Sequence, residues 1–250
     1  MQDCEDATKE IPFIGRASGD LVGLLEARTA SAGSVSLPVT ILQVLREAIV
    51  SGRLRAGTRL LEAHLARHLN TSRTPVRQAL IQLEHEKLVV IVPRASAYVR
   101  RVTERDVEEI YEIRGALEAL ATSLAIKHLT PVRIAQLEEA LEEIRRADIA
   151  SDEAVAATLD RFHALVIRLS HNVTLEQIYE NLVGPIRRLR RINLHGRARI
   201  EESLRANLRV AQAIVSSDPD APRYMSEHLA EVCLQIREAA RLDQSRETSI

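Results

Sequence analysis

The sequence predicts a mainly α-helical protein with two folded parts. An N-terminal winged helix-turn-helix with a small β-hairpin wing is followed by a C-terminal all-α antiparallel helical bundle of six or seven helices. The 250 residues are rich in Ala, Leu, Glu and Arg, with no Trp and two Phe, which favours helices. Two short amphipathic segments, the second led by arginines, predict the first part, and long amphipathic segments with short breaks predict the second.

The N-terminal residues 1–36 are rich in Ser, Ala, Gly and Asp and lack sustained periodicity. They predict a mobile arm with at most a short helix near Leu21–Arg28. Pro38 then opens a helix that ends at Ser51-Gly52, because proline suits the first turn of a helix and glycine its end. This helix begins the first domain, which we place at residues 37–102.

Two short helices joined by a polar turn follow, at about Glu62–Leu69 and Arg73–Lys87. Arg73 and Arg77 lie four residues apart and therefore share one exposed face of the second helix. The opposite, apolar face of that helix carries Val76, Leu80 and Leu83. A helix-turn-helix with an arginine-led second helix is suited to the DNA major groove.

Two β-rich runs complete this domain. Leu88–Val92 and Ala97–Val102 are joined by the turn residues 93–96 and predict a hairpin. The hairpin makes the unit a winged helix, and Arg94 at its tip is placed to lie against the DNA backbone or in the minor groove.

The charge is distributed unevenly along the chain. Residues 37–100 hold ten Lys or Arg and four Asp or Glu, whereas residues 1–36 have a net charge of −3 and the whole chain −1. A basic module beside acidic segments indicates a nucleic-acid partner. If this charge were the only observation, a basic surface that is simply exposed to water would be the alternative.

The remaining chain, residues 103–245, predicts the helical bundle. Thr130-Pro131 opens one helix as an N-cap followed by Pro, and Gly184-Pro185 is expected to kink another. The predicted helices are Asp106–His128, Pro131–Ala147, Glu153–Ser170, Thr174–Asn193, Arg199–Ser217 and Ala221–Leu242.

Several classes of protein are disfavoured. No apolar run is long enough for a bilayer, the N-terminus does not read as a signal peptide, and Cys4 and Cys233 imply no disulfide framework. We therefore expect a cytoplasmic protein without a membrane partner. No glycine-rich phosphate loop, HExxH or nucleophile elbow is present, so no enzyme is predicted. The scarcity of aromatic residues argues against single-stranded RNA binding.

About sixty contiguous residues resemble the GntR family of bacterial transcription regulators. The residues that carry the resemblance are Gly52–Glu62, Leu65-Ala66, Ser72–Arg77, Ala79-Leu80, Leu83-Glu84 and Leu88-Val89. The resemblance implies binding to a double-stranded DNA operator. The residues it assigns to DNA contact are Ser72, Arg73, Thr74, Arg77, Arg94 and Ser96.

Two roles are open for Arg77. It either donates two parallel hydrogen bonds to a guanine, or it contacts a phosphate, which carries no sequence information. The chain also departs from the family pattern. It has Ala56 where the family has Pro, Lys87 where it has Gly, and Ala95-Ser96 where it has Arg-Gly at the wing tip.

The C-terminal part resembles the FCD effector-binding domain of FadR-type GntR regulators over residues 103–240. The matching residues are Ile113-Arg114, Leu117-Glu118, Phe162-His163, Ser170–Asn172, Ala213-Ile214 with Asp218, and His228-Leu229. The resemblance implies a homodimer on an inverted repeat, a repressor more often than an activator, and a small organic or sugar acid as effector. The effector-binding residues it implies are Arg114, His163, Asn207 and His228.

Many FCD domains hold a divalent metal with an aspartate and three histidines. His163 and His228 occupy two of these positions, whereas Leu159 and Asn207 occupy the other two. Asp160 is a further candidate metal ligand, at the edge of the inward-facing stripe that Leu159, Phe162, His163 and Val166 form on the same helix. Two imidazoles and a neutral amide make a weak zinc site. No cofactor is therefore certain, and a metal sensor or metal-dependent enzyme that uses His163 and His228 is the alternative function.

Arg114 lies on the apolar stripe of its helix, where an unpaired guanidinium is costly. Two interpretations are open. In the first, the Arg114 guanidinium binds the carboxylate of an effector. In the second, Arg114 forms a buried ion pair with Glu118 or with another acidic residue of the bundle.

Overall fold

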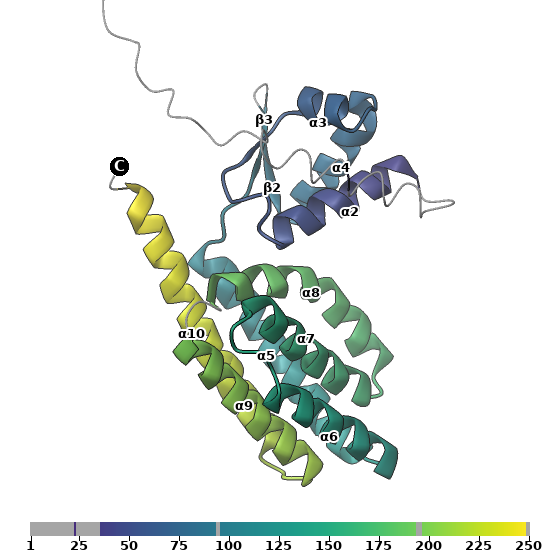
Figure 1. Ribbon diagram of the computed structural model, residues 1–250. Coiled ribbons are helices and arrows are strands. Elements are labelled where there is room, and N and C mark those ends of the chain that lie inside the picture. The colour runs from purple at the N-terminus through teal and green to yellow at the C-terminus, as the bar shows by residue number, and fades with distance from the viewer. Residues whose placement is uncertain (1–22, 24–35, 94–95, 194–196, 249–250) are drawn as a thin grey trace, which may run out of the picture. The chain divides into compact units, whose positions relative to one another are not determined.

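The computed structural model describes residue 23 and residues 36–93, 96–193 and 197–248 (Figure 1). Contacts divide the chain into two compact units, one up to Arg101 and one from Val102 onward. The predicted arm lies outside the described residues except for Gly23 and Ser36. The wing-tip residue Arg94 lies outside them as well.

Over residues 36–93 and 96–101, the first unit consists of three helices and a small sheet. Its helices are α2 (Leu37–Val50), α3 (Glu62–His68) and α4 (Arg73–His85), and α4 packs against both of the others. Pro38 lies in the first turn of α2, where its missing N–H breaks no helical hydrogen bond. The helices bury an aliphatic core whose largest members are Ile41, Leu45, Leu60, Leu80 and Leu83.

The sheet has three antiparallel strands in the order β1-β3-β2. Strands β2 (Val89–Val92) and β3 (Ser96–Val99) form the predicted hairpin. The additional strand β1 (Arg59–Leu60) pairs with β3 and places Leu60 opposite Ala97. Our sequence analysis missed β1 because two residues are too few to show an alternating pattern.

The second unit is an antiparallel bundle, as predicted. Within its described part, six helices follow one another: α5 (Glu104–Lys127), α6 (Pro131–Arg145), α7 (Asp152–Leu169), α8 (Val173–Asn193), α9 (Arg197–Val215) and α10 (Ala221–Thr248). Helix α10 lies alongside α5 and α9 (Figure 1). None of the helices described is long and apolar enough to cross a membrane.

Polar caps define where the helices of the bundle begin. Thr103 and Asp106 form a reciprocal capping box at the start of α5, and Thr130 and Ser151 cap α6 and α7. Helix α8 continues through Pro185, so the chain does not break there. The helix start predicted from Thr130-Pro131 agrees with the structure, because α6 begins at Pro131 and Thr130 is its N-cap.

The buried face of α5 differs from the predicted stripe. The spacing predicts a stripe of Val107, Ile110, Arg114, Leu117 and Ala121. Its members Val107, Arg114 and Ala121 are buried, but so are Tyr111 and Glu118, whereas Ile110 and Leu117 are only partly covered. Helix α5 is packed by α7, α8, α9 and α10, so its covered arc is wide and includes polar positions. A pattern built from apolar residues alone misses such positions.

Lys87 has a positive φ of 56° directly after the end of α4. This is the position at which the family has glycine, and a side chain there strains the backbone.

We expect Lys87→Gly to raise the free energy of unfolding of the first unit by up to about 1 kcal/mol. Urea unfolding measures this value. Lys87→Ala is the control, because it removes the lysine chain but keeps the strain; equal stability of the two variants would contradict the prediction.

Candidate functional site

Helix α4 begins after a tight turn from α3. Asn70 takes a left-handed conformation in this turn, with φ 46°, which asparagine tolerates better than most residues. The amide of Thr71 donates to the Ala66 carbonyl at 2.9 Å and closes the end of α3. Ser72, at the N-cap of α4, and Thr74 are exposed. The turn therefore presents the first residues of α4 to solvent.

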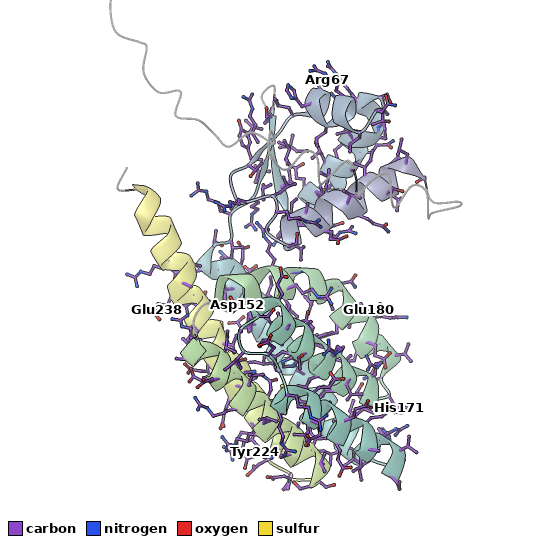
Figure 2. All side chains as sticks on the ribbon, in the orientation of Figure 1. Arg67, Asp152, His171, Glu180, Tyr224 and Glu238 are labelled. Carbon is purple, nitrogen blue, oxygen red and sulfur yellow. The ribbon has the colours of Figure 1, made fainter. Side chains whose placement is uncertain are left out.

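The two arginines of α4 are both exposed but differ in their contacts. Arg77 makes a two-pronged ion pair with Glu62 of α3, with Nε–Oε1 and Nη2–Oε2 distances of 2.9 Å. Arg73 forms no ion pair with any residue that the structure describes. Arg67 on α3 is a further exposed cation, and Figure 2 shows it at the outer side of that helix.

At the wing, Ser96 is engaged within the protein. The Arg59 Nε donates to the Ser96 Oγ at 2.8 Å, which places a guanidinium from β1 beside the start of β3. Sequence reasoning did not single out Arg59, because its position depends on the pairing of β1 with β3. The role predicted for Arg94 falls outside the described residues.

The polar residues predicted for the bundle lie in its core. Arg114, His163 and Asn207 are at most 2% exposed, and they come from α5, α7 and α9. His228 of α10 is half-buried. The packing of the four helices thus brings these side chains to the interior of one unit.

Glu118 is the centre of this interior network. Its Oε1 accepts from Arg114 Nε at 2.7 Å and from Tyr179 Oη at 2.9 Å, and its Oε2 lies 2.5 Å from His163 Nδ1. Arg114 Nη1 also donates to Tyr111 Oη at 3.2 Å. The buried ion pair with Glu118, one of the two interpretations of Arg114, is therefore present.

The charges within this network follow from burial and pairing. Burial alone would raise the pKa of Glu118, but Arg114 and His163 bring that pKa well below its ordinary range. Burial lowers the pKa of His163 in spite of Glu118. The network therefore contains one cation and one anion, with a neutral imidazole that donates its Nδ1–H to the carboxylate.

His228 lies next to this network and is also neutral. Its ring stacks on that of His163 with centroids 6.2 Å apart. Burial and the nearby His163 and Arg114 lower the pKa of His228 to about 3. The Asn207 Nδ2 donates to His228 Nε2 at 3.1 Å and to the Ser203 carbonyl at 2.8 Å.

Two buried polar atoms in this region have no hydrogen-bond partner among the described residues. They are the Arg114 Nη2, a donor, and the Asn207 Oδ1, an acceptor. Buried polar groups are almost always paired with protein, water or a ligand. One buried donor and one buried acceptor in this region thus keep unused hydrogen-bonding capacity.

The side chains present do not fit the metal centre that the family resemblance implies. Leu159 is apolar, and the Asn207 amide nitrogen faces His228. Asp160 pairs instead with Arg187, at 2.8 Å, and with Arg190. Within the described ranges, no three His, Cys, Asp or Glu side chains are grouped to hold a metal ion.

Sequence analysis missed three members of the interior network or gave them too small a role. Glu118 was considered only as a partner of Arg114, and the two tyrosines were not considered. Tyr111 lies three residues before Arg114 on the same helix, so its spacing was a usable signal. Tyr179 is 61 residues from Glu118, and only the packing of α8 on α5 brings them together.

We expect Glu118→Gln to lower the free energy of unfolding of the bundle by about 3–5 kcal/mol, because it leaves the Arg114 charge buried without a counter-charge. Adding Arg114→Met should recover part of this loss, since no charge then remains inside. Urea unfolding at pH 7 measures both variants. Glu180→Gln, on the exposed side of α8, is the control and should change stability by less than about 0.5 kcal/mol. A loss of the same small size for Glu118→Gln would disprove the role of the buried charge pair.

Comparison with known proteins identifies the family. The model for the gntR family of bacterial regulatory proteins matches residues 38–99, and the FCD domain model matches residues 109–231. The HTH-type transcriptional regulator YdhC of Bacillus subtilis is 31% identical over 181 residues, which are 72% of this chain and 81% of that protein. The HTH-type transcriptional repressor RspR of Escherichia coli is 30% identical over 200 residues, 79% of this chain and 88% of its own.

The solved structure of E. coli McbR (YncC) has a TM-score of 0.63 and 27% identity, and the match covers 84% of this chain and 100% of that one. Both family models lie where the sequence resemblance placed them, one on the winged helix and one on the bundle. The chain therefore belongs to the GntR family of DNA-binding transcription regulators and carries an FCD domain.

Proposed function

We propose that this protein is a homodimeric repressor in the bacterial cytoplasm. It binds an inverted-repeat operator, and a small carboxylate in the bundle changes its affinity for DNA. The observation that carries the proposal is the exposed start of α4, where Ser72, Arg73 and Thr74 are available to DNA. The name of the similar repressor RspR supports repression rather than activation.

DNA recognition follows from the geometry of α4. Its first residues are the ones that reach base edges when such a helix enters the major groove. Arg73 has no counter-ion among the residues described, so its donors are available to a phosphate or to the O6 and N7 acceptors of guanine.

Dimer formation is supported by an exposed apolar face on α5. Ile113 is 50% exposed and Leu120 is 48% exposed, and seven residues of helix place both side chains on one face. A second copy would cover the same face by two-fold symmetry. Such a dimer presents two recognition helices, which matches an inverted repeat in DNA.

The effector class is inferred from the two unpartnered atoms in the bundle. The Arg114 Nη2 fits a carboxylate oxygen, and the Asn207 Oδ1 fits a hydroxyl donor. A hydroxy acid or sugar acid offers both groups. Since Arg114 keeps Glu118 through its Nε, the effector adds to the ion pair rather than replacing it. To change DNA affinity, it must bind more tightly to one of two arrangements of the dimer.

The DNA-binding part is tested with Arg73→Ala on an operator that the full-length protein selects from random-sequence DNA. We expect the selected sites to contain an inverted repeat. The variant should bind them more weakly by about 1–3 kcal/mol in a gel-shift titration. Arg105→Ala, an exposed arginine on α5, is the control and should keep full affinity. Unchanged affinity of the Arg73 variant would rule out the assignment of α4 as the DNA-reading helix.

The effector part is tested by screening organic and sugar acids for release of the selected operator. We expect Asn207→Leu, which keeps the side-chain volume but removes the acceptor, to need at least about tenfold more acid for release, the size of one lost buried hydrogen bond. Its operator affinity should stay as in the wild type. The matched control is Gln212→Leu at an exposed position of the same helix. If Asn207→Leu responds like the wild type, Asn207 is not part of the effector site.

A further inference from the structure

We infer that Glu62 positions Arg77 so that Arg77 reads a guanine of the operator rather than only holding a phosphate. This inference rests on the proposed DNA-binding function. It assigns a specificity role to a residue that lies outside the recognition helix. The contact that carries it is the two-pronged ion pair between the first residue of α3 and the fifth residue of α4.

The carboxylate is the anchored member of this pair. Glu62 lies in the first turn of α3, where the free amides of a helix start favour a negative charge. Its side chain is 31% exposed, whereas that of Arg77 is 65% exposed. Since α3 packs against α4, the position of Glu62 is set by the fold, and it holds the mobile arginine tip from the protein side.

The ion pair leaves the outer edge of the guanidinium available. An arginine has five N–H donors, and Glu62 uses one on Nε and one on Nη2. One Nη1 donor and the second Nη2 donor lie side by side on the far edge of the plane, and the other Nη1 donor points toward the Cδ side. Two parallel donors on such an edge match the O6 and N7 acceptors of guanine. A guanidinium that is already oriented also loses less side-chain freedom when it binds.

A simple phosphate clamp would gain nothing from Glu62. A carboxylate beside the arginine cancels part of the charge that attracts the DNA backbone. Its presence on the exposed face of the helix-turn-helix is therefore useful for orientation and unfavourable for sequence-independent affinity. The two roles differ in their effect on base preference when the charge is removed: this preference falls if Glu62 orients Arg77, whereas it stays unchanged, and only the affinity for any DNA rises, if Glu62 merely neutralises Arg77.

The first unit contains a matched control. Arg46 of α2 and Glu86, just after α4, form an ion pair of the same two-pronged kind, with distances of 2.7 and 2.6 Å. This pair has no residue on the exposed start of α4. Glu86→Gln therefore removes the same chemical contact from the same unit without touching Arg77.

The experiment selects binding sites from random-sequence DNA with the full-length wild type and with Glu62→Gln, Glu86→Gln and Arg77→Lys. We expect the wild type and Glu86→Gln to enrich the same guanine in each half-site. Arg77→Lys should lower the preference for that guanine by about fivefold to a hundredfold, because lysine has no planar fork. Glu62→Gln should lower it by at least about threefold, a fraction of the bidentate contact, while affinity for random-sequence competitor DNA stays equal or increases.

Two results would overturn the inference. One is an unchanged guanine preference for Glu62→Gln, and the other is an unchanged preference and salt dependence for Arg77→Lys, because a lysine keeps the charge that a phosphate contact needs. If the wild type selects no sequence at all, the proposed DNA-binding function fails as well. If Arg73→Ala loses operator binding while both the Glu62 and Arg77 variants keep the wild-type preference, only the inference about Glu62 fails.

Discussion

The part of the bundle that the structure describes is organised around the buried carboxylate of Glu118, which connects helices α5, α7 and α8. Arg114 compensates its charge, and His163 and Tyr179 donate the other hydrogen bonds. A shift of α7 or α8 relative to α5 would take away a hydrogen bond that the buried carboxylate accepts, which costs more than the loss of a surface contact. This network therefore restricts the bundle to few arrangements. The effector that we propose for this interior would select among them.

The two units use the arginine–carboxylate pair in different ways. Inside the bundle, Arg114 and Glu118 are shielded from water, so the pair fixes structure and leaves one guanidinium nitrogen for another partner. Arg77 of α4 and Glu62 of α3 remain accessible, and the pair contributes little to stability in water. An exposed pair of this kind acts mainly through orientation. The degree of burial thus decides whether the same chemistry stabilises the fold or prepares a binding surface.

Much of the fold was predictable from short stretches of sequence. The polar turn before Arg73, the apolar spacing on α4 and the β-branched runs of the hairpin each act over a few residues, and the structure confirms all three. Strand β1 and the buried face of α5 were not predictable in this way. A two-residue strand exists only because β3 supplies its hydrogen bonds, and Glu118 is buried only because several helices cover α5.

The sequence by itself determined the helices, the wing, the basic character of the first unit and the residue types available in the bundle, because capping, periodicity and local charge are properties of neighbouring residues. Only the tertiary structure decided which partners these residues have. Glu118 lies 45 residues from His163, and Arg77 lies 15 residues from Glu62. Contacts over such separations depend on how the helices pack. A polar side chain that is exposed can hydrogen-bond to water, so only packing, which excludes water, decides which protein group becomes its partner.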